Sequence, residues 1–129
     1  MSVSKPSTLT LNNRFEANLY LIATGEGGRP GPISNRFIQQ IFCKTWSGGA
    51  RIDVPEEEGG ILMPGDHAKV HMTLQYGMHV KIGQSFTIWE HNKTIASGII
   101  TGYLPNILVP NNLGTLDLPY GTPKTKKQK

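Results

Sequence analysis

The sequence has 129 residues, a length at which one domain buries enough apolar surface to fold without disulfides or structural metals. It is 37% hydrophobic and 17% charged, and its 15 glycines and 9 prolines favour a turn-rich, all-β chain. A single cysteine excludes an internal disulfide and a multi-cysteine metal site. No segment reaches the roughly 18 consecutive apolar residues of a membrane-spanning helix, so we expect no membrane partner.

The net charge of +4 comes from the C-terminus. Up to Asp117 the chain carries nine Lys and Arg residues against nine Asp and Glu residues, so its body is neutral. The excess consists of Lys124, Lys126, Lys127 and Lys129. Such a segment is either a solvated tail or a flexible basic arm that contacts phosphates, and the charge alone favours neither.

The first part of the chain predicts a linker, a strand and a glycine-rich loop. Residues 1–12 are rich in Ser, Thr, Pro and Asn, and we assign them to a linker from a preceding domain. Apolar and polar residues alternate over residues 15–21, as in a half-buried strand. Residues 25–32, GEGGRPGP, follow this strand and surround Arg29 with glycines and prolines.

Further strands are predicted over residues 37–46 and 51–54, with Ser47, Gly48 and Gly49 as the turn between them. The acidic residues 56–60 predict a solvated loop.

Residues 63–66, Met-Pro-Gly-Asp, have Pro and Gly at the central positions of a type II turn. That turn leads into a strand over residues 68–75. The last two strands are predicted over residues 85–89 and 94–103, joined through residues 90–93.

Six short strands without a convincing helix predict an all-β fold, an antiparallel barrel or sandwich, over residues 13–105. Residues 106–129 contain prolines, paired asparagines and then the lysines. We expect them to form a C-terminal extension that lies outside the core and ends in a disordered or extended basic tail.

The glycine-rich loop does not have the chemistry of a nucleotide site. A P-loop needs GxxxxGK[ST], but Gly28 is followed by Arg29 and by Pro30, which has no backbone N–H. The dinucleotide pattern GxGxxG also fails at Pro30. We expect no nucleotide cofactor in this chain.

Other catalytic or metal signatures are equally weak. His67 and His71 lie four residues apart on one predicted strand, but no glutamate completes an HExxH motif. Cys43 lies in an apolar run, which favours a buried and inert thiol. No GxSxG nucleophile elbow is present, so we expect neither a metal nor an enzyme.

Several motifs together resemble one family in their order and spacing. They are Val3-Ser4-Lys5-Pro6, Arg14-Phe15-Glu16-Ala17, Glu26-Gly27-Gly28-Arg29, Met63-Pro64-Gly65-Asp66 and FTIWEHNKTIASG at residues 86–98. From about Val3 to Pro105 the chain resembles the third, C-terminal domain of translation elongation factor Tu. Lys44-Thr45-Trp46 resembles mitochondrial members, and the lengthened C-terminus is similar to that of nematode mitochondrial factors, which handle tRNAs with a missing arm.

The resemblance implies a non-catalytic, six-stranded antiparallel barrel whose outer surface holds the T stem of aminoacyl-tRNA. In the whole factor this barrel packs on domain two and on the GTPase domain, contributes to the surface met by elongation factor Ts, and acts at the ribosome. GTP and Mg²⁺ then belong to the GTPase domain, so we expect this sequence to be one domain of a longer factor. The implied location is the mitochondrial matrix, with the bacterial cytoplasm as the alternative.

The resemblance also implies a tRNA surface that departs from the family pattern. Arg29, Gln40 and Glu90 match positions that face the T stem. Gly49 stands in place of a threonine, Tyr76 where a lysine occurs, and His91 in place of a glycine. Ser85 replaces an arginine near the interface with the GTPase domain, and the tail lysines are expected to supply phosphate contacts that the altered barrel surface lacks.

Three alternatives stay open. The first is the barrel of a related GTPase, either the eukaryotic-type elongation factor or a sulfate-activating enzyme. The second is a barrel that binds only protein. The third, a free-standing hydrolase, is disfavoured by the missing nucleophile and metal motifs.

Overall fold

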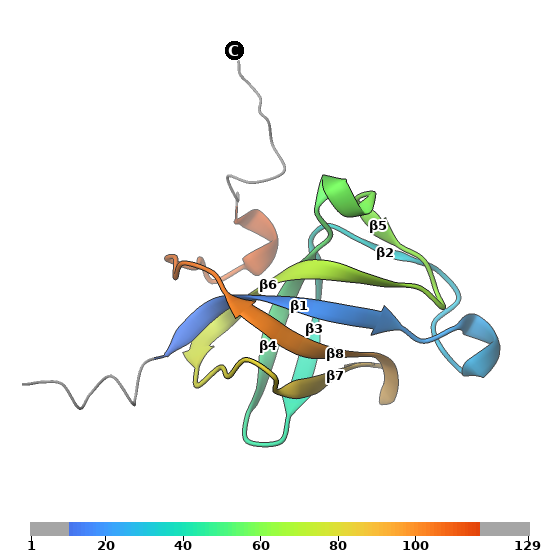
Figure 1. The fold of residues 1–129 in the computed structure, drawn as a ribbon. Helices are drawn as coiled ribbons and strands as arrows, with labels where there is room; N and C mark the ends of the chain where they lie inside the picture. Colours follow the sequence, from blue (N-terminus) through green and yellow to red (C-terminus); the bar gives the residue numbers. More distant parts are fainter. Residues whose placement is uncertain (1–10, 117–129) are drawn as a thin grey trace, which may run out of the picture.

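Six long strands close into one antiparallel barrel in the computed structural model, which describes residues 11–116 (Figure 1). Around the barrel the strands follow the order β1, β6, β4, β3, β7, β8, and β8 pairs again with β1. Their bounds are β1 Asn12–Leu21, β3 Phe37–Cys43, β4 Ser47–Asp53, β6 His67–Met78, β7 Ser85–Glu90 and β8 Lys93–Tyr103. The predicted all-β, six-stranded antiparallel barrel is confirmed.

β1 closes the barrel because it pairs along both of its edges. Phe15 lies opposite Met72 of β6, and Leu19 lies opposite Gly98 of β8. Tight hairpins join β3 to β4 and β7 to β8, whereas β1 reaches partners that are far away in the sequence (Figure 1). With every long strand paired on both sides, the barrel leaves no open sheet edge.

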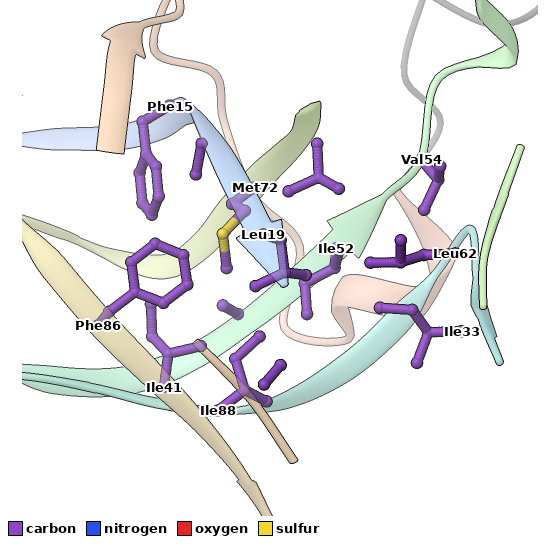
Figure 2. Packing of buried hydrophobic residues seen from close by; sticks show 14 of the residues in the cluster. Phe15, Leu19, Ile33, Ile41, Ile52, Val54, Leu62, Met72, Phe86 and Ile88 are labelled. Carbon is purple, nitrogen blue, oxygen red and sulfur yellow. The ribbon is translucent and has the colours of Figure 1, made fainter. Parts of the chain in front are cut away.

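The core lies inside the barrel and follows the predicted alternation. In β1, Phe15, Ala17, Leu19 and Leu21 are fully buried. Figure 2 shows the ring of Phe15 beside that of Phe86, with centroids 6.1 Å apart and planes at 70°, an edge-to-face contact. Most of the other core side chains are aliphatic, so the barrel interior is a packed core.

A short second sheet covers one end of the barrel. β2 (Ile33–Ser34) pairs with β5 (Ile61–Leu62), and the buried side chains of Ile33 and Leu62 lie beside Val54 (Figure 2). This is the end at which β1 and β7 end and β3 begins, and we call it the barrel mouth.

The turn and loop at residues 56–66 agree with the sequence. The Asp66 N–H donates to the Met63 carbonyl over 3.0 Å, and Gly65 has a φ of +91°, which identifies the predicted type II turn. Glu56–Glu58 (η3) forms an exposed 3₁₀ turn, as expected of a solvated acidic loop.

The predicted turn at Ser47, Gly48 and Gly49 is wrong. These residues are the first three of β4, with Gly49 opposite Gln40. The turn lies three residues earlier, at residues 44–46 between the two strands. There the Cys43 N–H donates to the Trp46 carbonyl over 2.8 Å. Pairing with β3 outweighs the low strand propensity of glycine, a tertiary effect that local composition does not contain.

Two glycine substitutions test this packing. A Cβ at Gly98 would lie 2.6 Å from Phe86 Cζ and 2.7 Å from the Asn18 carbonyl oxygen. We expect Gly98→Ala to lower the free energy of unfolding by about 1–3 kcal/mol, because the crowded core must shift. Urea denaturation followed by circular dichroism measures this loss.

Gly49→Ala is the matched control, because a Cβ there meets nothing within 4 Å. We expect its stability to stay within about 0.5 kcal/mol of the parent. Equal stability of the two variants would contradict the described register of β1, β7 and β8.

Candidate functional site

The glycine-rich loop is a tight turn at the barrel mouth. It contains the 3₁₀ turn η2 (Thr24–Glu26), after which Gly27 has a φ of +92°. A Cβ at Gly28 would lie 2.1 Å from the carbonyl oxygen of Ile22, so no other residue fits there without movement of the backbone. These glycines therefore serve the turn that carries Arg29.

Arg29 is held by three groups at the mouth. Its Nε lies 3.2 Å from Glu90 Oε1, its Nη1 donates to the Pro32 carbonyl over 2.6 Å, and its Cζ lies 4.9 Å from the ring centroid of Phe37. The Arg29 and Glu90 side chains are 22% and 17% exposed, so the pair is screened from bulk water on most sides. The fold thus brings together two predicted tRNA-facing residues that are 61 positions apart.

Gln40 and Gly49 lie on neighbouring strands of the barrel wall. Gln40 of β3 pairs with Gly49 of β4 on one side and with Trp89 of β7 on the other. Gln40 is exposed because Ile41, the next residue, points into the core. Trp89 is 40% exposed, with its ring centroid 5.0 Å from that of Phe42. It therefore adds an aromatic surface beside Gln40.

His91 and Tyr76 lie at opposite ends of the barrel. His91 and Asn92 form the exposed two-residue turn between β7 and β8, with φ values of 53° and 63°, as in a type I′ hairpin. This places His91 next to Glu90 at the mouth. Tyr76 is 73% exposed near the far end of β6, two residues beyond the Leu74 partner of Ala50. The fold does not bring Tyr76 to Arg29.

Residues 106–116 pack on the outside of the barrel, across β6, β4 and β3. The Gln75 side chain donates to the Pro110 carbonyl over 2.9 Å, and Arg51 donates to the carbonyls of Leu113 and Leu116. Leu113, in the 3₁₀ turn η4 (Leu113–Thr115), is 3% exposed. This part of the predicted extension is therefore attached to the barrel wall.

A buried ion pair anchors this segment. Arg51 Nε lies 2.9 Å from Asp53 Oδ2, and the two side chains are 3% and 4% exposed. Arg36 adds a bond of 2.6 Å from its Nη1 to the Gly114 carbonyl. A buried guanidinium needs such partners, because an unpaired buried charge is strongly destabilising. Lys124, Lys126, Lys127 and Lys129 lie outside the described residues.

A groove of about 630 Å³ crosses the outer faces of β1, β8, β7 and β3. Its walls include Tyr20, Phe42, Lys44, Ser85 and Ile99. Ile99 is 51% exposed, so the groove presents apolar surface to solvent. Ser85, which the resemblance associates with an interface, lies in this groove.

The histidines considered as metal ligands do not form such a site in the described part of the chain. Among residues 11–116 no three His, Cys, Asp or Glu side chains come together as metal ligands. Burial, followed by the nearby Arg14, lowers the pKa of His71. None of the helical turns in the described part of the chain has the length and apolar character to cross a bilayer.

Residues 8–103 match the family model of the elongation factor Tu C-terminal domain. The chain belongs to this family. It is a non-catalytic barrel domain of the translation elongation factor type, and the match spans β1 to β8. Residues 106–116, which form the segment attached to the outer wall, lie beyond the matched part of the elongation factor Tu domain.

Sequence reasoning missed some residues of this elongation factor Tu domain surface. The sequence identifies Phe37 only as a residue of a predicted strand. No pattern in the neighbouring residues shows that it lies beneath Arg29. Arg51 and Asp53 do carry a signal, because charges two residues apart in a strand lie on one face. The segment that buries them, however, contains Leu113, which lies 62 residues after Arg51 in the sequence.

Cys43 is only partly buried, against the edge of the core, so the prediction of a buried thiol is correct only in part. Its thiol gives a test of this packing. Burial raises its pKa from 9.0 to about 11. A raised thiol pKa lowers the thiolate fraction, so we expect alkylation by iodoacetamide at pH 8 to be about a hundredfold slower than in the urea-unfolded chain. Mass spectrometry over time measures both rates, and equal rates would contradict the described packing of β3.

Proposed function

We propose that this chain is the tRNA-binding barrel of an elongation factor Tu-type protein that delivers aminoacyl-tRNA to the ribosome. In this proposal the T-stem backbone passes the barrel mouth. One observation carries it: Arg29, Glu90 and His91, from two distant segments, meet at that mouth. All three occupy positions that the family resemblance associates with tRNA.

The chemistry of the adjoining wall supports an RNA backbone as ligand. Gln40 offers an amide for a phosphate or a 2′-hydroxyl, and its neighbour Trp89 offers a partly exposed ring for stacking. Arginine suits phosphate because its planar fork donates two parallel hydrogen bonds. Arg29 is the one cation among the described residues assigned to this tRNA surface, and Lys93, opposite Glu90 in the hairpin, is a second cation at the mouth. So few cations neutralise few phosphates, and we expect a modest affinity.

We propose that the groove around Ser85 receives the GTPase domain of the parent protein. An exposed apolar groove of this size is typical of a surface that binds another protein or domain. Phe42 and Ile99 supply apolar surface for such a contact. In this proposal GTP and Mg²⁺ belong to that partner domain. Domain two and elongation factor Ts are the further protein partners that the resemblance implies.

We further propose that the chain is of the mitochondrial type and acts in the mitochondrial matrix, with a nematode-like C-terminal extension that supplies phosphate contacts. The attached segment supports this role. Gly114 lies close to Ile38: a Cβ at position 114 would be 3.6 Å from Ile38 Cδ1. Ile38 lies two residues from Gln40 on the same face of β3. The last described residues of the extension, in η4, therefore lie beside the proposed tRNA surface.

A barrel that binds only protein is the second candidate, and the apolar groove favours it. The two functions differ in their response to salt. Phosphate contacts release counterions, so RNA binding weakens steeply as salt rises, whereas an apolar contact does not.

Replacement of Lys124, Lys126, Lys127 and Lys129 by glutamine tests the tail. We expect weaker binding of tRNA and a slope of log affinity against log salt that is shallower by about 0.7–0.9 for each phosphate that the variant no longer neutralises. Fluorescence anisotropy with labelled tRNA at several salt concentrations measures both quantities.

The matched control replaces the same four lysines by arginine, which keeps the charge and should preserve the slope. An unchanged affinity and slope in the glutamine variant would show that the tail is only a solvated end. Absence of salt-sensitive tRNA binding by the parent chain would favour the protein-binding barrel.

A further inference from the structure

We propose that Glu90 and Phe37 are positioning residues that hold the guanidinium group of Arg29 in one orientation, ready for an RNA phosphate. This inference rests on the proposed function. It assigns to Glu90 a role that acts through Arg29. It also adds Phe37, which no sequence pattern marks.

The first support is the geometry around Arg29. The Glu90 carboxylate accepts from Nε at 3.2 Å and the Pro32 carbonyl accepts from Nη1 at 2.6 Å, so two different sides of the guanidinium group are fixed. The Phe37 ring lies under the group, with its centroid 4.9 Å from Cζ, and limits movement of the group on that side. An arginine held in this way loses less rotamer freedom when it binds a phosphate than one that is mobile in the free protein.

The second support is the remaining nitrogen of the group. No residue of the described chain accepts a hydrogen bond from Nη2 of Arg29, and this nitrogen is not buried. With the side chain 22% exposed, Nη2 is reached by solvent. A phosphate oxygen fits there as a charge-assisted acceptor.

Glu90 is itself held in place. The Gln39 amide donates to Glu90 Oε2 over 3.4 Å, so the two carboxylate oxygens have separate donors. Glu90 ends β7, and its position is fixed by pairing with Lys93 across the hairpin. The chain of contacts from Gln39 through Glu90 to Arg29 is therefore anchored on two strands of the barrel.

The proposal predicts the direction in which removal of Glu90 changes the affinity for RNA. A carboxylate beside an RNA backbone repels phosphate, so its removal should tighten binding if it does nothing else. If Glu90 positions Arg29, its removal weakens binding instead, because the guanidinium group is released. The direction of the change thus separates repulsion from positioning.

The orientation is tested first in the free protein by NMR of the arginine Nε–H groups. We expect a resolved Arg29 Nε–H signal that exchanges slowly with water and loses this protection in Glu90→Ala. Glu56→Ala, which removes an exposed carboxylate in η3, is the matched control and should leave the signal unchanged. Rapid exchange of the Arg29 signal in the parent chain would overturn the proposal.

Binding is then measured with a labelled RNA stem-loop at low salt. We expect Arg29→Ala and Glu90→Ala each to weaken binding by about three- to tenfold, and the double variant to be no weaker than Arg29→Ala alone. Glu90→Gln, which keeps an acceptor for Nε, should weaken binding less, and Phe37→Leu should weaken it about twofold. Circular dichroism melting checks that each variant folds.

The outcomes separate this proposal from the proposed function. If Arg29→Ala weakens binding but Glu90→Ala tightens it or leaves it unchanged, RNA binding stands and positioning is overturned. Additive losses of affinity in the double variant also overturn positioning, because they show that Glu90 acts independently of Arg29. If the parent chain binds no RNA stem-loop at any salt concentration, both proposals fail.

Discussion

Closure of the barrel depends on the pairing of β1 with both β6 and β8. A six-stranded sheet that stays open leaves two unpaired edges, whereas β1 joins them and encloses the core. Closure also decides which side of each strand faces solvent. Ile41 points inward, so Gln40 must point outward, and with it the neighbouring Trp89. The composition of the outer wall is therefore a consequence of how the core is packed.

Two ion pairs of the described chain differ in their access to water. Arg51 and Asp53 are on the outer wall, yet both are buried because residues 106–116 lie over them. Arg29 and Glu90 are at the mouth and keep partial access to solvent. A fully buried pair keeps its partners because loss of one leaves an uncompensated buried charge, whereas a partly exposed pair can exchange a partner with a ligand. This difference makes the mouth the more suitable place for binding.

The two proposed binding surfaces differ in chemistry because they lie on different parts of the wall. The groove over β1, β8, β7 and β3 presents Phe42 and Ile99 and suits a protein surface. The mouth and the face that carries Gln40 and Gly49 present an oriented guanidinium, an amide and an exposed ring, which suit an RNA backbone. Phe42 contacts Trp89 and so connects the two surfaces.

Local sequence was enough to predict the fold class, most of the strands and the turn at residues 63–66, because alternation and turn chemistry are local properties. It was also enough to identify the family, since several motifs in order are specific together. It did not predict the start of β4 or the burial of Leu113, because both depend on pairing and packing between distant segments. The meeting of Arg29 with Glu90 and Phe37 is a property of the tertiary structure alone, since strand register and barrel closure, which no local pattern encodes, bring these residues together.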